Sequence, residues 1–63
     1  MTVKEIKQAL KQGLKVYWYH DGYEVRKDSI GQYLIVYKHP YNAIGLTDKK
    51  GNLNGNPKQF FIG

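Results

Sequence analysis

The chain contains no cysteine, and this absence sets the first limit on its chemistry. Disulfide bonds and thiolate zinc sites are excluded. Long apolar runs are also missing, because the longest strongly apolar stretch, 33–37, is far shorter than the roughly 20 residues of a membrane-spanning helix. The N-terminal residues lack the apolar segment of a signal peptide. We therefore expect a cytoplasmic protein with no membrane partner.

The residues that commonly perform catalysis are few and scattered. Ser29 is the only serine, and nothing in the spacing of His20 and His39 brings a base to it. The pair Asp28-Ser29 is typical of a turn that bonds its own backbone. Two histidines and five scattered carboxylates do not form the three or four convergent ligands of a metal site. The glycine-rich segment 51–58 lacks the spacing of a phosphate-binding loop. We predict no enzyme, no catalytic residue, no metal and no cofactor.

Acidic residues are scarce as well. The chain has ten lysines and arginines but only five aspartates and glutamates, so its net charge is +5. This excess favours polyanions or acidic protein surfaces as partners without specifying either. At 63 residues the chain is predicted to be a single domain, 1–63, that hides only about 60% of its surface on folding. Self-association would add stability, and the sequence favours neither a monomer nor a homo-oligomer.

The first segment with a clear pattern is helical. Thr2 and Glu5 have the spacing of a capping box, in which each side chain bonds a backbone N–H that the first helical turn leaves free. Gly13 supplies a residue suited to the left-handed conformation that ends many helices. The sequence therefore predicts a helix from about residue 3 to residue 12. Its apolar residues at helical spacing are Val3, Ile6 and Leu10.

After Gly13 the apolar period changes from helical to two, which is typical of strands. The pattern predicts a β meander over about residues 14–62, with a turn at 39–42 and a brief extended piece at Leu53. The predicted strands cover 14–20, 23–27, 32–38, 43–47 and 59–62. The expected fold class is α+β: an N-terminal helix followed by a four- to five-stranded antiparallel meander. We expect a strongly bent sheet or a small SH3-like barrel, with a flat sheet as the alternative.

The first hairpin decides which aromatic residues share a face. Asp21-Gly22 is a strong signal for a two-residue turn. That turn would place two sets of residues on opposite faces: Val16, Trp18, Tyr23 and Val25 on one, and Tyr17, Tyr19, Glu24 and Arg26 on the other. A three-residue loop, 20–22, would instead group Tyr17 and Tyr19 with Tyr23 and Val25. We favour the two-residue turn because it separates apolar from polar residues more cleanly.

The strand and turn residues resemble a group of small phage-encoded proteins with no assigned function. The segments that carry the resemblance are Val16-Tyr17-Trp18, Tyr23-Glu24-Val25, Lys27-Asp28, Gly31-Gln32-Tyr33-Leu34-Ile35, Ile44-Gly45-Leu46-Thr47, Leu53-Asn54-Gly55 and Phe60-Phe61-Ile62. The resemblance spans residue 14 to the C-terminus and departs from the pattern at 38–42 and at 49–50. It implies a phage or prophage accessory protein that acts in the bacterial host cytosol on a host component. It transfers no catalytic or binding residues.

The exposed aromatic and basic residues predict binding. Tyrosine and arginine are over-represented among residues that contribute most to interface energy. We therefore expect a protein-binding surface that inhibits or modulates a host protein. The candidate binding residues are Lys15, Tyr17, Tyr19, Arg26, Tyr37 and Tyr41.

Two alternative functions use the same residues. Small barrels bind single-stranded nucleic acid by stacking bases on surface aromatics beside a basic groove, and this is the first alternative. The second is an oligomeric sponge for an anionic nucleotide signal, held between protomers. Each tyrosine can also be explained as core material in so small a domain.

Overall fold

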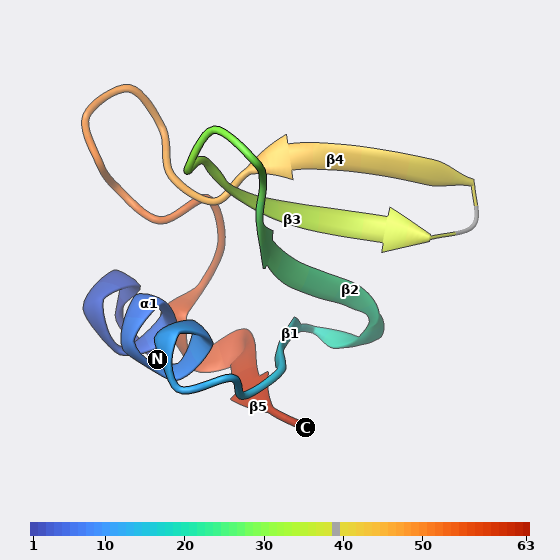
Figure 1. The fold of residues 1–63 in the computed structure, drawn as a ribbon, viewed down its shortest axis with the longest axis horizontal. Coiled ribbons are helices and arrows are strands. Elements are labelled where there is room, and N and C mark those ends of the chain that lie inside the picture. The colour runs from blue at the N-terminus through green and yellow to red at the C-terminus, as the bar shows by residue number, and fades with distance from the viewer. Residues whose placement is uncertain (39) are drawn as a thin grey trace.

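The computed structural model describes residues 1–38 and 40–63, and shows one α-helix followed by five antiparallel strands in a single open sheet (Figure 1). The elements are α1 (Val3–Lys11), β1 (Val16–Trp18), β2 (His20–Lys27), β3 (Tyr33–Lys38), β4 (Tyr41–Gly45), the 3₁₀-helix η1 (Pro57–Gln59) and β5 (Phe60–Ile62). The strand order is β4-β3-β2-β1-β5. The α+β prediction is confirmed. The sheet does not close into a barrel, since β4 and β5 form its two edges.

The helix begins and ends as its sequence predicts, within one residue. Glu5 Oε1 accepts a hydrogen bond from the Thr2 N–H at 2.9 Å, and Thr2 Oγ1 accepts one from the Glu5 N–H at 3.2 Å. This pair of contacts is the predicted capping box, and it lowers the pKa of the Glu5 carboxyl. At the other end, Gly13 has a φ of +80°, a left-handed conformation that glycine adopts without steric cost.

The core lies between α1 and one face of the sheet, called the inner face here. Its buried members are Ile6, Ala9, Val16, Val25, Ile35, Leu46 and Phe60. Trp18, Tyr23 and Tyr33 pack against this cluster while remaining partly exposed. The hairpin of β3 and β4 extends away from α1, so the far end of the inner face is left without the helix (Figure 1).

Two boundaries in the second half of the chain differ from prediction. Tyr41 and Asn42, expected in a turn, belong to β4, which ends at Gly45; His39, expected in the same turn, lies outside the described residues. Leu46 is buried in the core although it follows β4, because its N–H donates to the Tyr33 carbonyl at 2.9 Å and keeps the chain beside β3. The predicted extended piece at Leu53 is present as a bridge to Thr47.

Apart from Tyr19, the residues of the first hairpin lie on the predicted faces, but the turn is not the predicted one. Val16 pairs with Val25 and Tyr17 with Glu24, and this register differs by two residues from that of a turn at Asp21-Gly22. A shift of two residues leaves every side chain on its original face. His20, Asp21 and Gly22 are part of β2, and the chain instead reverses at Tyr19 after an irregularity between Tyr17 and Trp18.

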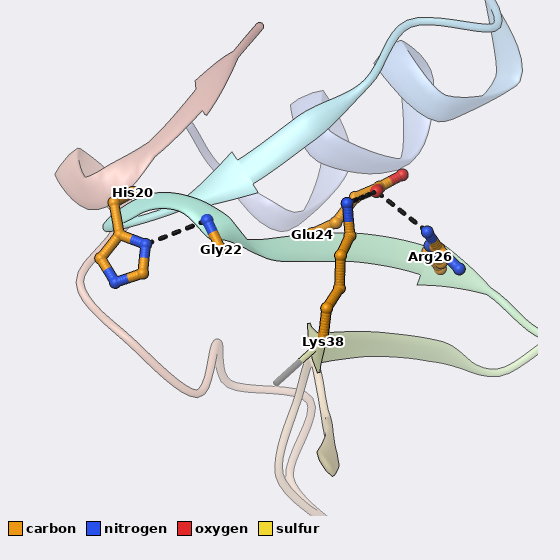
Figure 2. Close-up of polar contacts among 5 residues, drawn as sticks. All are labelled: His20, Gly22, Glu24, Arg26 and Lys38. Atoms are coloured by element: carbon orange, nitrogen blue, oxygen red, sulfur yellow. Dashed lines mark hydrogen bonds and ion pairs between the residues drawn. The ribbon is translucent and has the colours of Figure 1, made fainter. Parts of the chain in front are cut away.

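Long-range contacts explain why the local turn signal is overridden. Tyr19 donates its N–H to the Gln59 carbonyl at 2.8 Å, which holds the end of β1 against the chain entering β5. The ring of His20 lies 5.0 Å from that of Tyr23, and its Nδ1 accepts a hydrogen bond from the Gly22 N–H at 3.0 Å (Figure 2). Tertiary pairing and aromatic packing therefore place the reversal two residues before the Asp-Gly pair.

Candidate functional site

The face of the sheet opposite α1, called the outer face here, gathers aromatic and charged side chains from all five strands. The register places Tyr17, Glu24, Val36 and Ala43 side by side across four strands, with Phe61 of β5 next to Tyr17. The polar and aromatic members of the outer face are Tyr17, Glu24, Arg26, Lys38, Tyr41 and Phe61. Three of these, Tyr17, Arg26 and Tyr41, were predicted as binding residues, and the structure places them on one surface.

An ion-pair cluster occupies the centre of the outer face. Arg26 Nη2 lies 3.1 Å from Glu24 Oε1, and Lys38 Nζ reaches the same oxygen across the sheet at 3.4 Å (Figure 2). The Glu24 side chain is only 12% exposed. Its burial raises the pKa of Glu24, but the hydrogen bonds and charges of Arg26 and Lys38 outweigh this effect and leave the pKa lowered. Two cations thus share one carboxylate, and the cluster carries a net charge of about +1 near neutral pH.

Aromatic rings lie on the same face as the cluster. The rings of Tyr17 and Phe61 pack with centroids 5.7 Å apart, while Tyr41, on the edge strand, is 73% exposed. The pKa of Arg26 is raised, chiefly by Glu24, with smaller contributions from Tyr41 and Tyr17. The guanidinium is held in place by Glu24. The outer face therefore presents a fixed cation and large aromatic rings on one surface.

The other three predicted binding residues lie elsewhere. Tyr37 is on the inner face, where its ring lies 4.7 Å from that of Tyr23, and Lys15 precedes β1 with its carbonyl accepting the Gly63 N–H. The expected extension of the aromatic patch through Tyr37 is therefore wrong. Tyr19 does not share the face of Tyr17, because the chain reverses at that residue.

Tyr19 has an unusual backbone conformation. Its φ is +67°, in the left-handed region that bulky residues rarely adopt, yet its side chain is 66% exposed. This conformation costs about 1–2 kcal/mol relative to the right-handed one. Backbone strain at an exposed aromatic residue is a feature found at binding sites. Tyr19 thus forms a second exposed aromatic group, distinct from the outer face.

Sequence reasoning missed three members of the outer face. Glu24 and Lys38 were not proposed as site residues, although the predicted register already placed Glu24 beside Arg26. Phe61 could have been found from the alternation of Phe60 and Phe61, which sends one ring inward and the other outward. Its position beside Tyr17 depends on the pairing of β5 with β1, a contact between the two ends of the chain that no local pattern contains.

The ion-pair cluster predicts a pH-dependent contribution to stability. Replacing Glu24 by glutamine is expected to lower the free energy of unfolding by about 0.5–1 kcal/mol at neutral pH, since Arg26 and Lys38 are partly exposed. The pKa of Glu24 is depressed in the folded state, so this stability is present above its unfolded value of about 4.3 and is lost as the pH falls through the folded pKa. Urea unfolding at neutral and at acidic pH measures the effect.

The control for this prediction is Asp21→Asn, which removes an exposed carboxylate outside the cluster. A Glu24→Gln variant that is equally destabilised at acidic and neutral pH would show that glutamine disturbs packing rather than charge.

The other candidate sites considered from the sequence were a Ser29–histidine pair and a metal site. Asp28 Oδ1 accepts hydrogen bonds from the Ile30 and Gln32 N–H groups, so the segment around Ser29 is the predicted turn. His20 and Ser29 lie at opposite ends of β2. Within residues 1–38 and 40–63, no three histidine, aspartate or glutamate side chains lie together as metal ligands. In the same part of the chain, no helix is both long and apolar enough to cross a membrane.

These features define the chain as a small α+β domain with an aromatic and charged face opposite its helix. No protein-family model, no curated protein and no solved structure matches it. Its function must therefore be argued from the geometry of its own residues.

Proposed function

We propose that the protein is a non-enzymatic binding protein that uses its outer face to bind another protein. The observation that carries this proposal is that Arg26 is held by Glu24 at 3.1 Å on the same face as Tyr17 and the exposed Tyr41. A charged group fixed in advance loses little conformational freedom on binding. Tyrosine and arginine are enriched among the residues that contribute most to the energetics of protein interfaces.

The charge arrangement supports a protein partner over a nucleic acid. Single-strand binding surfaces use a positively charged groove that follows the phosphates. Here Arg26 and Lys38 are both engaged by Glu24, which is itself an acidic group in the middle of the face. A phosphate backbone would have to compete with that carboxylate, whereas a protein partner could satisfy it.

The biological setting is part of the same proposal. The resemblance to small phage-encoded proteins supports a phage or prophage accessory role in the cytoplasm of a bacterium. In that role the partner would be a host protein that this chain inhibits or redirects.

Affinity capture from a bacterial lysate with four immobilised proteins tests the proposal. Wild type and Lys50→Glu are expected to retain the same partner protein, and Arg26→Glu is expected to lose it. Lys50 lies in an exposed turn outside the five strands, so its reversal changes the net charge equally and is the matched control. Tyr19→Ala is expected to stay folded, and its loss of the partner would add Tyr19 to the surface.

Two results would count against this function. Equal loss in Lys50→Glu and Arg26→Glu would mean that overall charge, rather than the outer face, drives capture. Tight binding of a fluorescent mixed-sequence single strand, with a steep decrease from low to physiological salt, would replace the protein partner with a nucleic acid.

A further inference from the structure

β4 is an edge strand, and the hydrogen bonds of its neighbours show which of its backbone N–H and C=O groups point away from β3. Leu46 donates its N–H to the Tyr33 carbonyl at 2.9 Å, and hydrogen-bonded pairs alternate along an antiparallel ladder. Asn42 and Ile44 therefore bond to β3, while the backbone groups of residues 41, 43 and 45 point away from it. The Asn54 side chain confirms this direction, since its Nδ2 donates to the outward Gly45 carbonyl at 2.9 Å.

Apart from Asn54, which covers the Gly45 carbonyl, the β4 edge has none of the usual features that prevent edge strands from pairing. Edge strands are commonly protected by charged residues, proline, bulges or short length. β4 has five residues without a charge or a proline, and Tyr41 and Ile44 are 73% and 47% exposed. The opposite edge, β5, has only three residues, and the N–H of its first residue, Phe60, already donates to the Pro57 carbonyl.

We infer that β4 pairs with β4 of a second copy of this chain, antiparallel and about a two-fold axis at Ala43. In that register the outward N–H and C=O of Ala43 bond reciprocally to those of the other Ala43. Tyr41 of each copy lies opposite Gly45 of the other, and Asn42 lies opposite Ile44. The Gly45 carbonyl has a second lone pair and can accept from Tyr41 of the second copy while Asn54 remains bound.

The side chains on this edge are self-complementary. Glycine in a strand leaves its cross-strand partner uncovered, and an aromatic residue opposite it restores the packing. The exposed Tyr41 ring of the second copy would cover Gly45, and symmetry repeats the contact.

Charge and size favour a second copy as the occupant. β4 carries no charge, so two chains of net charge +5 can meet there without like charges facing one another directly. A domain of this size has a small core, and self-association is a common source of additional stability. Pairing would join the two sheets and place two outer faces on the same side of one dimer. The proposed function would then be bivalent.

Sedimentation equilibrium over a wide concentration range tests the dimer. Wild type is expected to reach twice the chain mass of 7.3 kDa. Ala43→Pro removes an N–H that points away from β3, so the variant should keep its fold and sediment as a monomer. Ile62→Lys charges the β5 edge instead and should remain dimeric, which makes it the control.

A second variant and hydrogen exchange also test the β4–β4 dimer. If circular dichroism shows that Ala43→Pro is unfolded, Tyr41→Ser, which keeps the backbone intact, is expected to raise the dimer dissociation constant at least about tenfold, or roughly 1.4 kcal/mol. Hydrogen exchange should show protection of the Ala43 amide that is lost on dilution. A wild type that stays monomeric at its highest concentration, or a dimer lost in Ile62→Lys but kept in Ala43→Pro, overturns the inference.

Discussion

Replacing Trp18 with alanine is expected to lower the free energy of unfolding by about 3–5 kcal/mol. Trp18 packs against the core cluster, and its ring lies 5.0 Å from that of Tyr23 and 6.3 Å from that of Phe60. Truncation would remove apolar contacts from three strands at once. Because small domains have little stability to lose, the variant should be largely unfolded at room temperature.

Thermal and urea unfolding of Trp18→Ala and Trp18→Phe measure this effect. Phenylalanine retains an aromatic ring and should cost less than alanine. Ile30→Ala is the control, because Ile30 is 77% exposed in the turn after β2 and should change stability by no more than about 0.5 kcal/mol. An unchanged midpoint for Trp18→Ala would mean that the core does not depend on the indole.

The second large effect is expected at Gly55. A Cβ at this position would lie 2.8 Å from Trp18 Nε1 and 3.2 Å from Trp18 Cε2, and the φ of Gly55 is +152°, which side chains rarely adopt. Gly55→Ala should therefore lower the free energy of unfolding by about 2–3 kcal/mol through a steric clash added to backbone strain.

Gly51 provides a matched control for Gly55. Its φ is +84°, but a Cβ there would meet no atom within 4 Å, so Gly51→Ala should show only backbone strain of about 1 kcal/mol. The clash can be isolated by repeating Gly55→Ala in the Trp18→Phe background, which lacks the indole Nε1, and its cost should decrease there because contacting residues are not additive. Equal costs for Gly51→Ala and Gly55→Ala would refute the assigned contact with the indole.

The parts of the fold that local signals determine were predictable from the sequence. The capping box, the glycine at the end of α1 and the apolar run 33–37 each depend on neighbours a few residues apart. The faces of β1 and β2 were also predictable, because alternation fixes them regardless of where the turn lies. The open sheet was not, since barrel closure depends on whether β4 reaches β5 in space.

The candidate site was likewise only partly predictable from local sequence. Tyr17 and Arg26 could be grouped from the pattern of one hairpin. The exclusion of Tyr19 from that group could not, because the reversal at Tyr19 depends on a hydrogen bond to Gln59, forty residues later in the chain. Phe61 and Lys38 reach the outer face through strand pairings that no local window contains.

The indole of Trp18 can report on the folding of the chain through its fluorescence. Its Nε1 is buried, and within residues 1–38 and 40–63 it has no hydrogen-bond partner. Trp18 is the only tryptophan of the chain, so its fluorescence comes from one known place. An indole N–H kept from water emits at shorter wavelength than a hydrated one, and unfolding would expose it. The chain therefore contains its own optical reporter for the packing of Gly55, Tyr23 and Phe60, with no added label.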